Sequence, residues 1–65
     1  MITVIFPDNS RREIEGDGIT GETLLLNLGL NPYEIILSRN GCMITEDTRV
    51  FSGDEIRLIA IVHGG

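Results

Sequence analysis

The most constraining feature of this sequence is that its two most apolar segments lie at opposite ends of the chain. Residues 1–6 read MITVIF and residues 55–62 read EIRLIAIV, and both are rich in the β-branched residues that favour strands. Strands that are apolar at nearly every position belong in the middle of a sheet. We therefore expect the first and last strands to lie side by side at the centre of one sheet.

A hairpin partner and one helix are predicted after the first strand. Residues 11–15 (RREIE) follow the turn formers of residues 7–10 (PDNS) and carry one apolar residue, as an edge strand does. Thr20 can cap a helix over residues 23–28 that ends at Gly29. The apolar face of this helix, which can cover one side of a sheet, is formed by Leu24, Leu25 and Leu28.

A second hairpin is predicted in the other half of the chain. Residues 34–39 and 42–44 flank Asn40-Gly41, a dipeptide typical of tight hairpins. Residues 45–50 are polar and are expected to be irregular, and residues 52–54 (SGD) make a turn before the last strand.

The order of these elements is strand, strand, helix, strand, strand, strand. A connection through a helix makes the first and last strands parallel. This order predicts the β-grasp (ubiquitin-like) arrangement of the α+β class, a mixed sheet of four to five strands packed on one helix. We assign residues 1–62 to this domain and residues 63–65 to a flexible C-terminal tail.

Composition narrows the classes of function. The 65 residues suffice for one domain and not for a multidomain enzyme. Ten acidic residues against five basic ones give a net charge of -5, which disfavours direct binding to nucleic acid. No apolar run approaches the roughly 18 residues of a membrane span, and the start lacks the basic flank of a signal peptide. We therefore expect a soluble cytoplasmic protein that binds neither nucleic acid nor membrane.

Two features that often carry chemistry are interpreted here as structural. Cys42 is the single cysteine, so neither an internal disulfide nor a four-cysteine metal site can form, and we expect a small buried side chain. The glycines of residues 16–21 (GDGITG) have the spacing of a dinucleotide-binding loop, but the segment before them is polar instead of a buried strand. We interpret them as turn glycines ahead of the helix.

The segment with the clearest functional meaning is the terminal Gly64-Gly65. No catalytic triad, acid–base pair or metal site can be assembled from the sequence, and the only histidine, His63, lies beside these glycines as a candidate partner contact. Glycines lack Cβ, so an extended tail can thread a narrow cleft and present an unshielded carboxylate. A carboxylate becomes an electrophile once it is converted to an acyl-adenylate, which requires ATP and a second protein. We therefore expect a protein that is not an enzyme and whose C-terminus another protein modifies.

The last strand and the tail carry a resemblance to a known family. Residues 53–58 (GDEIRL) and 61–65 (IVHGG), with the leucine-rich helix and the Asn40-Gly41 hairpin, resemble the ThiS/MoaD family of ubiquitin-like sulfur carriers. The resemblance covers the whole chain and is greatest for the compact archaeal ubiquitin-like small modifier proteins.

The resemblance implies a carrier cycle that uses Gly65 as the reacting residue and Gly64 as its flexible approach. An activating enzyme of the ubiquitin-activating class would adenylate the Gly65 carboxylate with ATP, and sulfur from a donor protein would displace AMP to give a thiocarboxylate. The acceptor would be a synthase in thiamine or molybdopterin biosynthesis, or an enzyme of tRNA thiolation. The chain itself would bind no cofactor and no metal.

The resemblance also implies a docking surface for the activating enzyme. Strand alternation turns the side chains at 56 and 58 toward the helix. The opposite face of the sheet then carries an exposed patch that leads to the tail: Ile5, Arg57, Ile59 and Ile61. The alternative is that loops or the tail cover these residues and no partner binds there.

Two other functions stay open at this point. A ubiquitin-like modifier would be conjugated through Gly65 to lysines of target proteins, and it could not build lysine-linked chains because all five of its basic residues are arginine. A binding module would have an inert tail. We expect a monomer with transient partners, since a tail that enters an active site has to stay free.

Overall fold

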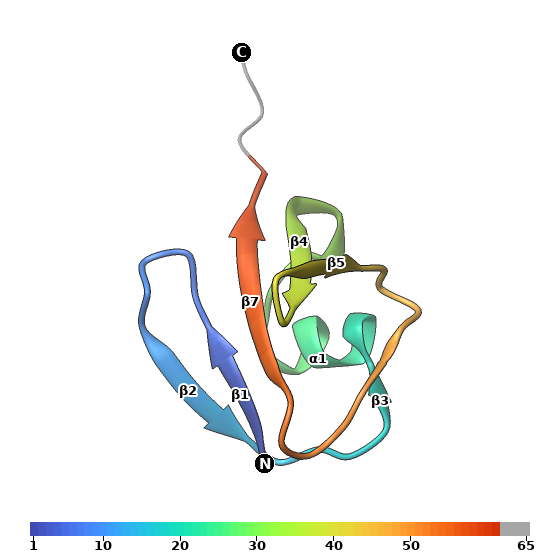
Figure 1. Cartoon of the computed structure of the whole chain (residues 1–65). Helices are drawn as coiled ribbons and strands as arrows, with labels where there is room; N and C mark the ends of the chain where they lie inside the picture. The colour runs from blue at the N-terminus through green and yellow to red at the C-terminus, as the bar shows by residue number, and fades with distance from the viewer. Residues whose placement is uncertain (62–65) are drawn as a thin grey trace.

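The central sheet has five strands, and the last strand of the chain lies in its middle. The computed structural model describes residues 1–61. The strands occur in the order β2-β1-β7-β4-β5 across the sheet (Figure 1). Their bounds are β1 (Ile2–Ile5), β2 (Arg11–Ile14), β4 (Ile35–Arg39), β5 (Cys42–Ile44) and β7 (Glu55–Ala60). β1 and β7 are parallel neighbours and the other pairs are antiparallel, so the predicted placement of the two apolar ends is confirmed.

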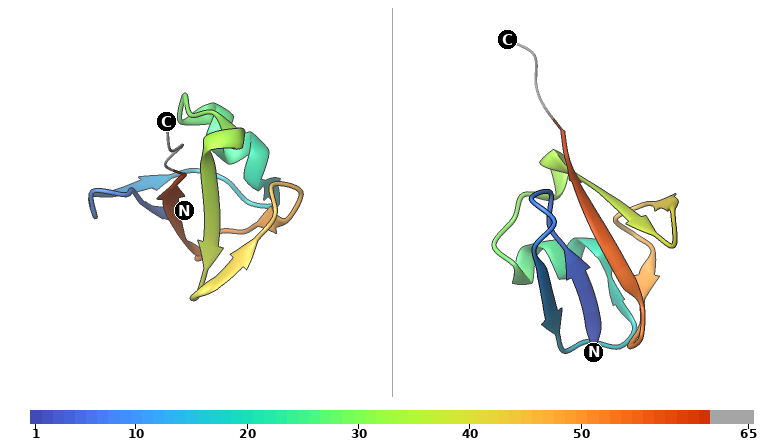
Figure 2. Two further views of the ribbon diagram at one scale, coloured as in Figure 1. Left: turned by 90° about the horizontal axis from the view of Figure 1, so that it is seen from above. Right: turned by 60° about the vertical axis from the view of Figure 1, so that its left-hand side comes forward.

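One helix, α1 (Gly21–Asn27), packs on one face of this sheet (Figure 2). The hydroxyl of Thr20 accepts a hydrogen bond from the Thr23 N–H and caps the helix as predicted. Gly29 follows the helix with a φ of 76°, a left-handed conformation that glycine adopts without strain. The core between helix and sheet is formed by side chains that are almost fully buried: Ile2, Val4, Leu24, Leu25, Leu37, Val50, Ile56 and Leu58.

The hairpin between β4 and β5 has the two-residue turn that Asn40-Gly41 predicts. Asn40 has a φ of 52° and Gly41 a φ of 82°, the pair of positive values that a type I′ turn requires. A single turn of 3₁₀-helix, η1 (Pro32–Glu34), leads into β4. It begins at Pro32, and the side chain of Asn31 caps it by accepting the Tyr33 N–H.

The prediction that residues 45–50 are irregular holds for residues 45–48 and was wrong for residues 49–50. β3 (Ile19–Thr20) and β6 (Arg49–Val50) pair as a second, two-stranded sheet beside the helix. Val50 is fully buried there, because this pairing closes the core at the start of α1. Neither segment carries a periodic signal of its own, since each pairs over only two residues.

The prediction that Cys42 is buried was also wrong. Cys42 is exposed because it opens β5, the outermost strand on its side of the sheet, directly after the turn. The glycines of residues 16–21 serve the turn and the helix start: Gly18 has a φ of 81°, and Gly21 is buried against Leu37.

Candidate functional site

The face of the sheet opposite α1 is the candidate docking surface. Ile59 on β7 is 42% exposed and Ile61, just beyond it, is 38% exposed. Met43 on β5 shares this face and is 74% exposed. Half-buried Ile36 lies directly opposite Ile59 in the strand register. We call these four residues the outer-face patch. Its apolar side chains face away from the core, where a partner can cover them.

The sequence analysis missed two members of the outer-face patch, Ile36 and Met43. The signal was available in the hairpin. A two-residue turn at 40–41 pairs Ser38 with Met43 and, by alternation, sets Ile36 on the same face. The pairing gives the face of Ile36 and Met43 but not their exposure. They were therefore predicted only as strand residues and not as part of a docking surface.

Ile5 lies on this face as predicted but is only 2% exposed, so its place in an exposed patch is a correction. Its neighbours in the register are Arg11 on β2 and Arg57 on β7. Both arginines reach across β1: Arg57 donates to the Asn9 side chain at 3.3 Å, and Arg11 pairs with Glu55 at 3.7 Å. Long arginine stems cover apolar surface in this way and shield Ile5 from solvent.

Arg57 is exposed and also contacts Asn9 within the chain. Its guanidinium is directed toward the β1–β2 turn and away from Ile59. The outer face is thus divided into a charged half over β2, β1 and the start of β7, and an apolar half over β4, β5 and the end of β7. A partner that docks along β7 meets both halves.

The end of β7 is held to the sheet as far as the described chain extends. The N–H of Ile61 donates to the carbonyl oxygen of Glu34 at 2.9 Å, which continues the β4–β7 pairing by one step. The outer-face patch therefore reaches the last described residue. The predicted reacting residue Gly65, with Gly64 and His63, lies outside the described residues.

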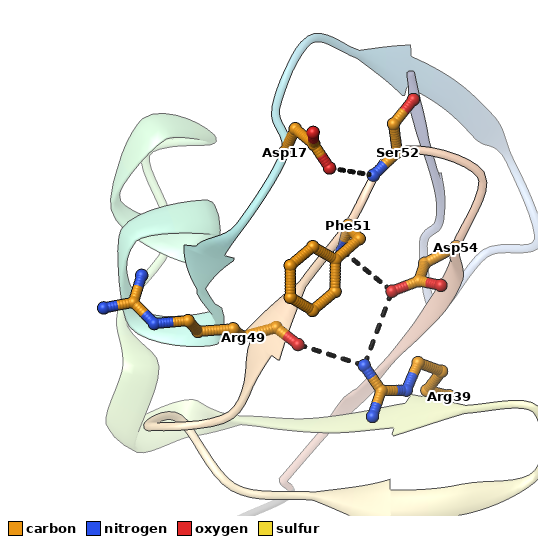
Figure 3. A network of polar contacts seen from close by, with 6 residues as sticks. All are labelled: Asp17, Arg39, Arg49, Phe51, Ser52 and Asp54. Carbon is orange, nitrogen blue, oxygen red and sulfur yellow. Dashed lines mark hydrogen bonds and ion pairs between the residues drawn. The ribbon is translucent and has the colours of Figure 1, made fainter.

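A polar network anchors the start of β7 (Figure 3). Arg39 Nη1 donates to the carbonyl of Arg49 at 3.0 Å and pairs with Asp54 Oδ2 at 3.4 Å. The same carboxylate oxygen accepts the Phe51 N–H at 2.8 Å. Asp54 thus closes the turn, as the sequence predicts, and also joins β4 to the loop before β7. This anchoring holds the register of β7 and so the position of the patch.

Asp17 adds a second anchor on the same loop. Its Oδ1 accepts the N–H of Ser52 at 3.1 Å (Figure 3). The contact joins the turn before β3 to the turn before β7, which are 35 residues apart in the chain.

The titratable side chains of residues 1–61 include a carboxylate with a lowered pKa and form no metal site. Within residues 1–61, no three His, Cys, Asp or Glu side chains lie close enough to hold a metal ion. The pKa of Asp8 is lowered from its ordinary value because the Ser10 hydroxyl and N–H both donate to the carboxylate, but this contact serves the exposed β1–β2 turn. No helix among the described residues is long and apolar enough to cross a membrane.

The sheet order and the single helix define the ubiquitin-like β-grasp class, and a solved structure confirms it. An NMR solution structure of a computationally designed protein based on the template of human erythrocytic ubiquitin is similar to this chain with a TM-score of 0.68. The similarity covers 98% of this chain and 94% of that chain at 24% sequence identity, a level that establishes the fold alone. No curated protein is similar enough in sequence to count as a match.

The sequence profile of the ThiS family matches residues 4–65, and the chain therefore belongs to the ThiS family. Members of this family are small carrier proteins rather than enzymes, and membership supports a role as a sulfur carrier. It also implies interaction with an adenylating enzyme and with sulfur-transfer partners in general.

Proposed function

We propose that this chain carries sulfur as a thiocarboxylate on Gly65. The observation that carries the proposal is the ThiS family match, which extends through Gly64-Gly65 at the end of the matched segment. The fold supports it: β7 is the last strand before these glycines in the sequence, and the chain stays paired with the sheet up to Ile61.

The proposed chemistry takes place in a partner enzyme. A carboxylate oxygen of Gly65 attacks the α-phosphorus of ATP, and pyrophosphate leaves to give the acyl-adenylate. A hydrosulfide equivalent from a sulfur donor protein then attacks the carbonyl carbon. AMP leaves together with the carboxylate oxygen that had attacked the α-phosphorus, and the thiocarboxylate remains on Gly65. The chain contributes the Gly65 carboxylate, and ATP is bound by the enzyme.

The outer-face patch is the proposed docking site for that enzyme. Exposed apolar side chains of Ile59, Ile61 and Met43 supply the contact area that an interface core requires. Ile59 and Ile61 lie at the end of β7, and Met43 lies two strands away on β5, so an enzyme that covers them binds beside the strand that precedes Gly64-Gly65 in the sequence. Arg57 contributes charge at the border of the patch.

The test is activation of the purified chain by its cognate adenylating enzyme with ATP and a sulfur donor. Intact-mass analysis is expected to find one oxygen replaced by one sulfur, and fragmentation is expected to place the sulfur on Gly65. A chain lacking Gly64 and Gly65 is the control and is expected to stay unmodified. Joining of Gly65 to lysines of other proteins without any thiocarboxylate would contradict the proposal in favour of a protein modifier.

A further inference from the structure

A second surface borders the outer-face patch, where β5 stops short of the full length of β4. It is an open apolar groove between α1, η1 and the side of β4 that faces away from β7. The residues that form it come from four elements and the loop after β5: Leu25, Pro32, Ile35, Leu37, Ile44 and Glu46. Ile36 and Met43 of the outer-face patch lie at its rim.

The groove exists because the β4–β5 ladder covers only part of β4. Pairing with β5 runs from Arg39 to Leu37, whereas pairing with β7 continues to Ile35. After Ile44 the chain turns toward the helix, where the carbonyl of Glu46 accepts the N–H of Glu22 at 2.9 Å. The first two residues of β4 are therefore left with an open edge.

The open edge presents a hydrogen-bond acceptor. Along an antiparallel strand, the main-chain groups of successive residues point to opposite sides. The carbonyl of Glu34 points toward β7, where it accepts the Ile61 N–H, so the carbonyl of Ile35 points to the groove. Within residues 1–61 we find no donor to this oxygen. A strand edge of this kind can pair with an added extended segment.

Charge identifies the kind of segment that fits. Glu46 is the charged residue of the lining, and Glu34 ends η1 close to Pro32. None of the arginines lines the groove, and the whole chain has a net charge of -5. The groove thus has a largely hydrophobic lining with one carboxylate, that of Glu46, and Glu34 lies on the neighbouring η1.

We propose that this groove binds an extended segment of a partner protein in which apolar residues are flanked by lysine or arginine. A main-chain N–H of the segment donates to the Ile35 carbonyl oxygen, and an apolar side chain packs against the half-buried Ile35 and Ile44. The flanking cations lie near Glu34 and Glu46. This interaction requires neither Gly65 nor sulfur chemistry, so it stands independently of the carrier role.

The probe is an acetylated and amidated peptide, Lys-Lys-Thr-Val-Ile-Val-Lys, titrated into the full chain with labelled leucine and isoleucine methyl groups. We expect saturable changes in the NMR signals of Leu25, Ile35 and Ile44, with the signal of Leu26 on the outer side of α1 unchanged. The same peptide with glutamate in place of lysine is expected to bind at least about tenfold more weakly, because the carboxylates of Glu46 and Glu34 repel it.

A matched pair of variants tests the role of charge. Glu46→Lys is expected to weaken binding by about threefold or more, as the loss of one partly exposed ion pair predicts. Asp47→Lys makes the same charge change on the next residue, outside the lining, and is expected to change the affinity by less than about twofold. Circular dichroism checks that both variants keep the fold.

Three results would overturn the proposal. The first is the absence of saturable changes up to about 1 mM peptide, a limit that corresponds to very weak binding. The second is an equal effect of Glu46→Lys and Asp47→Lys. The third is a change of the groove signals with protein concentration alone, which would make a second copy of the chain the occupant.

Discussion

Ile59 provides a quantitative test of the docking surface. Complete burial of an isoleucine side chain contributes about 1.5–3 kcal/mol. Because Ile59 is 42% exposed, cover by a partner enzyme adds about 0.6–1.3 kcal/mol to the free energy of association. Ile59→Ala is therefore expected to lower kcat/KM for activation about three- to ninefold.

The assay is ATP–pyrophosphate exchange by the cognate adenylating enzyme, with initial rates measured against the concentration of each variant. The loss is expected in KM with kcat unchanged, since the contact is equal in the bound ground state and the transition state. Leu26→Ala is the matched control, because Leu26 is 58% exposed but lies on α1, on the other side of the sheet. A change below about twofold for Ile59→Ala, or an equal loss for Leu26→Ala, would refute the docking argument.

Three further predictions concern the fold that positions this surface. Asp54→Ala removes the partner of a partly buried arginine and the acceptor of a loop N–H, so urea unfolding should give a free energy of unfolding lower by about 1 kcal/mol; an unchanged midpoint would contradict the anchoring role. Gly21→Ala adds a Cβ that collides with the buried Leu37 side chain, and we expect a loss of about 1–3 kcal/mol in the same experiment, whereas a gain from helix propensity would show that the core can adjust. Ser10→Ala removes the hydroxyl that lowers the pKa of Asp8, so an NMR titration should show this pKa rising toward its ordinary value, and no rise would contradict the assignment. Because the folded-state pKa of Asp8 is depressed, the stabilisation is present above the unfolded-state pKa and is lost as the pH falls through the folded-state pKa, so the effect of Ser10→Ala on stability should disappear in acid.

Most of the sheet could be predicted from the sequence because its signals are local. The β-branched ends of the chain indicated the central strands, the capping Thr20 and the leucine face indicated the helix, and Asn40-Gly41 indicated the hairpin. Each signal lies within a few residues of the element that it specifies. The parallel pairing of β1 and β7 then followed from the connection through the helix.

The failures share one physical cause, which is that burial depends on residues distant in sequence. Val50 is buried by a two-residue pairing in which its partner is Ile19, 31 positions earlier in the chain. Ile5 is covered by arginines that reach over it from both neighbouring strands. Cys42 is apolar enough for a core but lies on an outermost strand. Periodicity in the sequence predicts the face of the sheet on which a side chain lies. Tertiary contacts with residues distant in sequence determine whether that side chain is buried.

The central claim is tested most directly by the intact mass of the chain isolated from its own host. The account predicts a species in which sulfur replaces one oxygen of the Gly65 carboxylate. Addition of an alkylating reagent should convert this species to a stable adduct of higher mass. An unmodified carboxylate, even after incubation with ATP, a sulfur donor and the cognate adenylating enzyme, would contradict the account.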